Sequence, residues 1–252
     1  MLKIDINSDM GEGFGLYQLG QDEEMMKYIS SVNIACGFHA GDPHIMNKTI
    51  RLAKEFNVSI GAHPGFPDLI GFGRRYMRAS LNEVRDYIIY QLGALREFAR
   101  YHDAIIQHVK PHGALYMMAM DDENIARTIL EAMAKVDPNT IVYALNNSAV
   151  VEVGKVMGIR VAKEVYADRE HTSNGSIVLT RTGENIVDLK QKAERVVRMV
   201  KEGLVKTVTG EEISIEAQTV CIHGDTPGAV ELVKEIHIAL ERNNITVQSI
   251  KE

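Results

Sequence analysis

Short apolar segments alternate with stretches of helical periodicity along the whole chain. Seven such segments can be interpreted as strands, at residues 3–9, 31–37, 59–65, 104–113, 140–145, 160–168 and 219–225. The stretches between them carry helix start signals. Asp42 and Pro43 form an N-cap with proline at the first helical position, and Ser80 with Glu83 forms a capping box. This alternation predicts a parallel sheet joined by right-handed crossovers.

The pattern within the strands distinguishes a closed barrel from an open sheet. In the first strand, Asp5, Asn7 and Asp9 alternate with isoleucines, so one face of the strand is polar. Helices cover both faces of a central strand in an open doubly wound sheet, so both faces should then be apolar. A polar face suits the interior of a barrel near its mouth. The sequence therefore predicts a TIM-like β/α barrel of seven parallel strands in a single domain, residues 1–252, with an open doubly wound sheet as the alternative.

Composition and charge exclude several classes of protein. The chain has 252 residues, of which 45% are hydrophobic, and its net charge of -6 comes without a basic block, which argues against a nucleic-acid partner. No apolar run is long enough for a membrane span, and the N-terminal MLKIDINSD lacks the apolar core of a signal peptide. We therefore expect a cytoplasmic protein that acts without nucleic acid or membrane. Cys36 and Cys221 lie in apolar runs, which predicts two buried thiols.

Titratable side chains collect where six of the seven predicted strands end. Ligands bind at the carboxyl ends of the strands in barrels and in open α/β sheets alike. The residues at these ends are Asp9 and Glu12, His39 and Asp42, His63 and Asp68, Lys110 and His112, Asp168 and Arg169, and His223 and Asp225. Asp42 as an N-cap and Asp68 as a turn residue each have a structural alternative. The four histidines at equivalent positions predict one shared site.

The residues alone leave more than one chemistry open. An aspartate with histidines can hold Zn²⁺ or a similar ion, and Asp9, His39 and His63 are the candidate ligands. No H-E-x-x-H, P-loop or G-x-G-x-x-G motif is present. The glycine-rich GAHPGFPDLIGFGRR ends in two arginines, which suit an anionic group, and a lid or a plain surface loop is the alternative. Lys110 at an inward strand position requires a carboxylate or an anionic ligand as its partner.

Six motifs along the chain resemble those of the LamB/YcsF family. In order they read DINSDMGEGFG, NIACGFHAGDP, GAHPGFPDLIGFGRR, VKPHGALY, EVYADR and IHGDTPGAV. They run from the first strand to the last helix, so the resemblance covers essentially the whole chain. The chain departs from the family after Arg169, where the family usually shows a tyrosine and then Asp-Gly, and this sequence reads EHTSNG. Any role of that loop is therefore open.

The resemblance implies a fold and an activity. The fold is a seven-stranded β/α barrel similar to the glycoside hydrolase/deacetylase superfamily. The activity is the ATP-dependent opening of 5-oxo-L-proline to L-glutamate, which yields ADP and phosphate. ATP would be a co-substrate, accompanied by Mg²⁺. Two partner subunits, PxpB and PxpC, which resemble KipI and KipA, are implied as well.

Such a reaction needs cations for phosphate and carboxylate groups and a base for water. Lys110 and Arg74 or Arg75 are the candidates for binding the anionic groups of the substrates. Asp168 and Arg169, at the same rim, are further candidates for binding substrate or phosphate. Candidates for the general base or a Mg²⁺ contact are Asp9, Glu12 and Asp225. His39, His63, His112 and His223 would orient substrate or carry protons. The alternatives are a metal-dependent amidohydrolase or deacetylase acting without ATP, and a binding or regulatory protein without turnover of its own.

Overall fold

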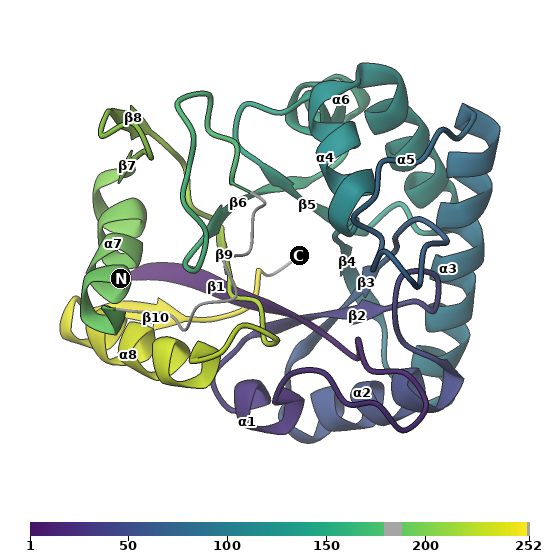
Figure 1. The fold of residues 1–252 in the computed structure, drawn as a ribbon, viewed down its shortest axis with the longest axis horizontal. Helices are drawn as coiled ribbons and strands as arrows, with labels where there is room; N and C mark the ends of the chain where they lie inside the picture. Colours follow the sequence, from purple (N-terminus) through teal and green to yellow (C-terminus); the bar gives the residue numbers. More distant parts are fainter. Residues whose placement is uncertain (179–187, 251–252) are drawn as a thin grey trace.

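Seven parallel strands close into a barrel in this computed structural model, which describes residues 1–178 and 188–250 (Figure 1). The barrel strands are β1 (Leu2–Met10), β2 (Ser31–Ala35), β3 (Ser59–His63), β4 (Ile106–Val109), β5 (Ile141–Leu145), β6 (Val161–Tyr166) and β9 (Thr219–Cys221). The first six pair in sequence order, and β9 pairs with both β6 and β1 to complete the ring. The predicted seven-stranded barrel is confirmed, and the open doubly wound alternative is wrong.

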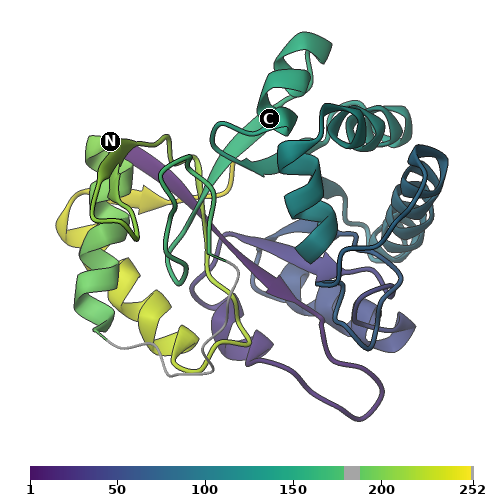
Figure 2. The ribbon, with the colours of Figure 1, turned by 45° about the horizontal axis from the view of Figure 1, so that its top comes forward.

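Helices surround the barrel on the outside (Figure 2). They are α1 (Asp22–Met26), α2 (Pro43–Glu55), α3 (Leu81–Tyr101), α4 (Gly113–Asp121), α5 (Glu123–Val136), α6 (Ala149–Met157), α7 (Leu189–Glu202) and α8 (Ala229–Arg242). Two predicted helix starts are confirmed: Asp42 accepts hydrogen bonds from two backbone N–H groups of α2, and Ser80 with Glu83 forms a capping box on α3. Among the described residues, no helix combines the length and apolarity that a membrane span requires.

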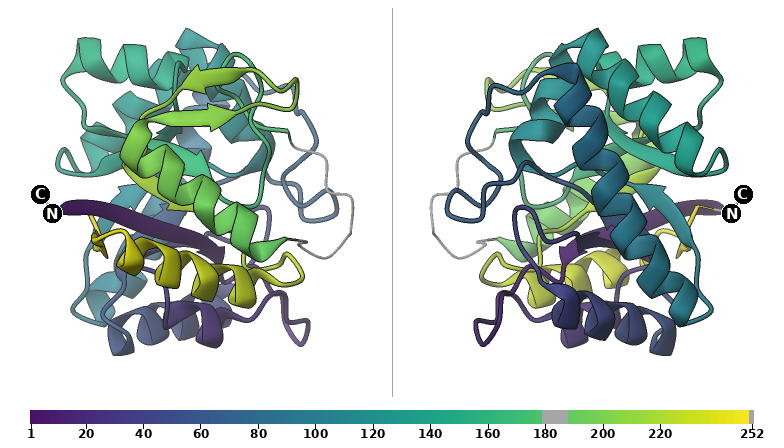
Figure 3. Two further views of the ribbon diagram at one scale, coloured as in Figure 1. Left: turned by 90° about the vertical axis from the view of Figure 1, so that its left-hand side faces the viewer. Right: turned by 90° about the vertical axis from the view of Figure 1, so that its right-hand side faces the viewer.

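Three short strands outside the barrel were not predicted. The strands β7 (Leu204–Lys206) and β8 (Glu212–Ser214) form an antiparallel hairpin, and β10 (Ile245–Val247) pairs with the start of β1. In Figure 3 this hairpin lies above α7, and α8 runs beside α7. Each of the three strands has only three residues, which is too short for a period-two pattern to stand out from the flanking sequence.

The interior of the barrel is polar down to its base, as the alternation in β1 predicts. Asp5 is 1% exposed, and its carboxylate accepts hydrogen bonds from the hydroxyl groups of Ser30, Ser31, Tyr143 and Thr219. Burial raises the pKa of Asp5, and the four hydrogen bonds offset only part of that effect. The floor of the barrel is therefore a hydrogen-bonded layer of polar side chains instead of an apolar core.

His108 is a packing residue of this layer. Its Nε2 atom lies 2.8 Å from Oδ1 of Asn33, and its ring stacks on Tyr143 with 4.1 Å between the centroids. A Cβ atom at Gly61 would lie 2.0 Å from Nε2 of His108, so only glycine leaves room for this ring. Burial and the nearby Lys110 ammonium lower the pKa of His108 to about 3.

Candidate active site

A cavity of about 240 Å³ opens at the carboxyl ends of the barrel strands. Seven of the predicted site residues line it: Asp9, His63, Arg74, Lys110, His112, Arg169 and His223. Three more support the lining residues from behind, since Glu12 and His39 lie against His112, and Asp168 lies against His223. The tertiary structure therefore brings together residues that are up to 214 positions apart in the sequence, from Asp9 to His223.

Lys110 is a buried cation at the floor of this cavity, with an exposed fraction of 2%. Its Nζ atom lies 3.2 Å from Oδ1 of Asp9, 3.0 Å from Oε1 of Glu164 and 2.9 Å from Sγ of Cys221. Burial by itself would lower the pKa of the ammonium, but the carboxylates of Asp9 and Glu164 hold the pKa well above its ordinary value. Lys110 therefore has the anionic partners that the sequence analysis required, and it stays charged.

Glu164 is a site residue that the sequence analysis did not assign. Besides Lys110, its carboxylate accepts hydrogen bonds from the hydroxyl groups of Tyr116 and Tyr166, each at 2.8 Å, and from Nδ2 of Asn7 at 3.0 Å. Its side chain is fully buried. The sequence signal that could have identified Glu164 is a glutamate at an inward position of a barrel strand. Its partner Lys110 could not be inferred in the same way, because Lys110 lies on another strand more than 50 residues earlier in the chain.

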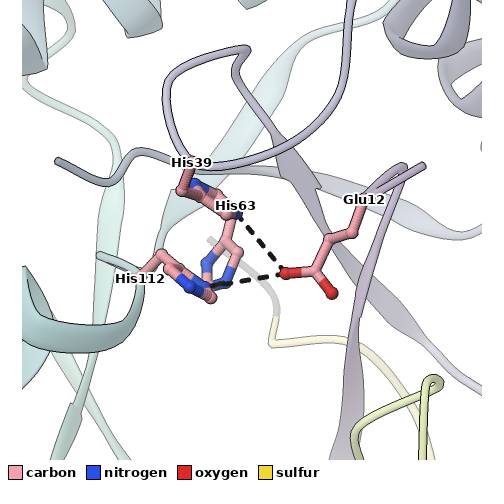
Figure 4. A group of neighbouring side chains, drawn as sticks. All are labelled: Glu12, His39, His63 and His112. Carbon is pink, nitrogen blue, oxygen red and sulfur yellow. Dashed lines mark hydrogen bonds and ion pairs between the residues drawn. The ribbon is translucent and has the colours of Figure 1, made fainter. Parts of the chain in front are cut away.

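Three histidines and one glutamate form a second group directly beside Lys110 (Figure 4). Nδ1 of His63 lies 2.7 Å from the backbone carbonyl oxygen of Lys110, and Nε2 of His63 lies 2.9 Å from Nδ1 of His112. Oε1 of Glu12 lies 3.4 Å from Nε2 of His39 and 3.6 Å from Nδ1 of His112. Burial lowers the pKa of both His39 and His112 well below the ordinary value, which favours their neutral forms.

The donor atoms of this group decide which ion it suits. Imidazole nitrogens with one carboxylate suit zinc and similar transition metals, whereas Mg²⁺ prefers oxygen ligands. Asp9, a candidate ligand from the sequence, contacts the Lys110 ammonium through Oδ1, and its Oδ2 lies 3.4 Å from Nε2 of His63. Glu12 is the carboxylate closest to His39, at 3.4 Å from Nε2. The group is therefore a poor site for Mg²⁺.

His223 and Asp168 form a hydrogen-bonded pair at the opposite side of the cavity. Nδ1 of His223 lies 2.9 Å from Oδ2 of Asp168, and Nε2 of His223 lies 3.6 Å from Oδ2 of Asp9. Burial would raise the pKa of Asp168, but His223 and the guanidinium of Arg169 hold it well below the ordinary value. A charged Asp168 fixes the proton of His223 on Nδ1 and leaves Nε2 directed toward the cavity.

Two predicted site residues, Arg75 and Asp225, neither line the cavity nor support its lining from behind. The side chain of Arg75 is 65% exposed and forms hydrogen bonds with Asp68, whereas that of Arg74 lines the cavity and lies 4.9 Å from the ring centroid of Phe72. Asp225 does not line the cavity. It follows the end of β9, so the expected continuation of that strand to residue 225 is wrong. The strand ends at Cys221, so the period-two alignment does not extend to Asp225.

The structure also shows where Asp42, the two cysteines and His171 lie. Asp42 is the N-cap of α2, and Cys36 and Cys221 are free and buried, as predicted. His171, in the segment that departs from the family pattern, is buried, and its Nδ1 lies 2.7 Å from Nη2 of Arg195. It packs the base of that loop and does not line the cavity.

Comparison with known proteins decides the family. The sequence profile of the LamB/YcsF family matches residues 4–252. The chain belongs to the LamB/YcsF family. Curated relatives that bear the name of the A subunit of 5-oxoprolinase include those of Pyrococcus horikoshii, 48% identical over 252 residues, and Thermococcus sibiricus, 50% identical over 252 residues. Each match covers 100% of this chain and 99% of the relative.

Two solved structures are similar to this chain in fold. The lactam utilization protein from Thermus thermophilus superposes with a TM-score of 0.92 at 40% identity, over 99% of this chain and 100% of the other. The family 4 carbohydrate esterase from Streptomyces lividans gives a TM-score of 0.50 at 8% identity, over 99% of this chain and 93% of the other. The second likeness concerns the fold alone, and it confirms the predicted deacetylase-like barrel.

Proposed function

We propose that this chain is the A subunit of an ATP-dependent 5-oxoprolinase, which opens 5-oxo-L-proline to L-glutamate while ATP is hydrolysed to ADP and phosphate. The observation that carries the proposal is the identity of about half of all residues, over the full length, with relatives that bear this name. The cavity supports it, because a volume of about 240 Å³ suits a small cyclic amino acid.

The charges around the cavity match the charges of this substrate and of its activated form. The carboxylate of 5-oxoproline would bind the guanidinium groups at the rim, Arg74 and Arg169. The lactam oxygen, and the phosphate transferred to it, would face the Lys110 ammonium. Because Lys110 is already held by two carboxylates, it needs no rearrangement to stabilise negative charge that develops there.

His223 is the best placed group for proton transfer. Asp168 holds its Nδ1–H, so Nε2 is available to accept a proton from the water that attacks the ring carbon bearing the phosphate. The same nitrogen then donates that proton to the ring nitrogen as the C–N bond breaks. The acyl phosphate that results is hydrolysed to glutamate and phosphate. Asp9, 3.6 Å from Nε2, would stabilise the imidazolium between the two steps.

The nucleotide would depend on other subunits. This chain has no P-loop or G-x-G-x-x-G motif, and its relatives are named as one subunit of an enzyme. We assign the missing functions to partners of the PxpB and PxpC type. Mg²⁺ would arrive with ATP, bound by phosphate oxygens and carboxylates, since the histidine-rich group beside Lys110 does not suit it.

Reconstitution tests the proposal. Glutamate release from 5-oxoproline and ATP is measured with this chain alone and with both partner subunits. We expect little turnover by the single chain and ATP-dependent turnover by the complex. Full activity of the single chain, with no partner detectable by mass spectrometry, would contradict the division of labour.

A second candidate is a metal-dependent amidohydrolase that acts without ATP, which the group of Glu12, His39, His63 and His112 favours. Omitting ATP from the same assay separates the two functions. Glutamate release that continues at an unchanged rate without nucleotide would favour the amidohydrolase, and release that requires ATP would exclude it.

A further inference from the structure

We propose that Glu12, His63 and His112 bind a divalent transition metal ion of the zinc type, and that His39 orients the glutamate. The proposal rests on the geometry of these side chains and holds whatever the substrate is, because metal binding can be measured without an assay of turnover. The four residues lie at or just after the ends of β1, β2, β3 and β4, so the site exists only once the barrel has closed.

The backbone fixes the protonation of both ligand rings. Nδ1 of His63 lies 2.7 Å from the carbonyl oxygen of Lys110, and Nε2 of His112 lies 2.8 Å from the carbonyl oxygen of Phe72. A carbonyl oxygen only accepts hydrogen bonds, so each of these nitrogens carries a proton. In a neutral ring the other nitrogen then carries a lone pair. Such carbonyl contacts are the usual way in which proteins orient metal-binding histidines.

The lone pair on Nε2 of His63 faces the lone pair on Nδ1 of His112, and this arrangement requires a cation between them. Nε2 of His63 and Nδ1 of His112 lie 2.9 Å apart, and both side chains are buried. Two lone pairs at this separation repel each other unless a metal ion or an additional proton lies between them.

Glu12 supplies the third ligand and a negative charge. Its Oε1 lies 3.6 Å from Nδ1 of His112, and its side chain is only 6% exposed. Tetrahedral ligands at about 2.0–2.1 Å from an ion are separated by roughly 3.3 Å, so the separations of 2.9 and 3.6 Å fall on either side of that value. His63 and His112 also line the cavity, which leaves a fourth position for water or substrate on that side.

His39 supports the ligands and is not itself a ligand. Its ring stacks on that of His112 with 3.7 Å between the centroids and an angle of 3°. An ion in the plane of His112 therefore lies out of the plane of His39. Neither ring nitrogen of His39 has a hydrogen-bond partner within the described part of the chain, and Nε2 lies 3.4 Å from Oε1 of Glu12. After a small shift of Glu12 toward an ion, Nε2 of His39 would donate a hydrogen bond to the Glu12 carboxylate.

Glycine backbone holds the stacked rings in place. A Cβ atom at Gly73 would lie 2.7 Å from Cβ of His39 and 2.8 Å from Cδ2 of His112, and the residue has a φ of +64°. A Cβ atom at Gly65 would lie 2.7 Å from Nδ1 of His39. The backbone thus packs closely against both rings, which restricts their movement and preorganises the site for an ion.

Metal binding by the full chain, prepared without a histidine tag, tests the proposal. The protein is stripped with a chelator, incubated with Zn²⁺ or Co²⁺, freed of excess ion and analysed by elemental mass spectrometry. We expect one ion per chain, and with Co²⁺ the visible absorption of a site with nitrogen and oxygen ligands. Glu12→Ala and His112→Ala should lose the ion. His39→Asn should weaken binding by about 10- to 100-fold, the usual effect of a residue behind a ligand.

Two matched variants distinguish this site from its neighbours. Asp9→Asn and His223→Asn change carboxylate and imidazole groups of the same cavity that the proposal does not use, and both should keep one ion per chain. Circular dichroism and melting temperature confirm that each variant is folded. Wild-type protein that binds no stoichiometric Zn²⁺ or Co²⁺ would overturn the proposal and favour a shared proton between the rings. Loss of the ion in Asp9→Asn but not in Glu12→Ala would overturn the ligand assignment.

Discussion

The ammonium of Lys110 lies 3.0 Å from Oε1 of Glu164 at the centre of the barrel, and both side chains are almost completely buried. Asp9 lies at 3.2 Å on another side of the same nitrogen. The lysine therefore offsets part of the charge of two carboxylates that are shielded from water. Its loss would affect the stability of the barrel as well as the chemistry of the cavity, so the two effects have to be separated.

Replacing the buried lysine should damage both stability and activity. In Lys110→Met, Asp9 and Glu164 lose their cation, and breaking a buried ion pair in this way costs about 3–5 kcal/mol. Removal of a preorganised charge from a reacting site lowers turnover by about 10²- to 10³-fold. Urea unfolding and glutamate release by the reconstituted complex measure the two effects on the same preparation.

A double variant separates the two roles of this lysine. Glu164→Gln in the Lys110→Met background removes one of the two uncompensated charges and keeps the shape of the side chain. We expect the free energy of unfolding to recover in part, while turnover stays low. Turnover that recovers together with stability would show that Lys110 is only structural.

Asp168→Asn should lower turnover with little effect on substrate affinity. An asparagine can still contact His223, but its neutral amide no longer stabilises the imidazolium or selects the Nδ1–H form. The expected result is a lower kcat with a KM close to that of the wild type. The measurement is steady-state kinetics with 5-oxoproline as the varied substrate. A raised KM at constant kcat would instead assign Asp168 to substrate binding.

Adjacent arginines provide a matched comparison. Arg74 lines the cavity, so Arg74→Ala should raise the KM for 5-oxoproline. The side chain of Arg75 is 65% exposed and bonded to Asp68, and surface ion pairs contribute little to stability. Arg75→Ala should therefore leave kinetics and stability close to those of the wild type. Equal effects of the two substitutions on KM would contradict the placement of the substrate carboxylate at Arg74.

The protein should lose stability in acid because it buries neutral histidines. Burial lowers the pKa of His108 and of His171 to about 3, against an ordinary value of 6.5. Between these two values the unfolded chain binds protons that the folded chain does not. The free energy of unfolding therefore falls as the pH drops from about 6.5 toward 3, by up to roughly 1.4 kcal/mol per pH unit for each histidine.

His171→Asn tests this pH dependence away from the cavity. Urea unfolding of the variant should show a shallower fall of stability between about pH 6.5 and pH 5 than the wild type shows, because one buried imidazole no longer takes up a proton on unfolding. Above about pH 7 the two slopes should agree. Parallel curves over the whole range would show that His171 does not contribute.

The barrel and the convergence of most candidate site residues follow from the sequence alone. Local periodicity marks the strands and helices, and the alternation of Asp5, Asn7 and Asp9 with isoleucines indicates a polar interior. Parallel strands present their carboxyl ends at one rim, so residues at those ends must converge whatever their separation in sequence. Seven of the predicted residues accordingly line one cavity.

Which side chains face one another depends on the tertiary structure. The ammonium of Lys110 meets Glu164, and Glu12 rather than Asp9 lies against the histidines His39 and His112, because the register between strands and the course of the loops set these distances. Arg75 turns away from the cavity while Arg74 lines it, although the two are neighbours in the chain. Sequence patterns report the face of a strand, but contacts across a barrel arise from packing between segments that are distant in sequence.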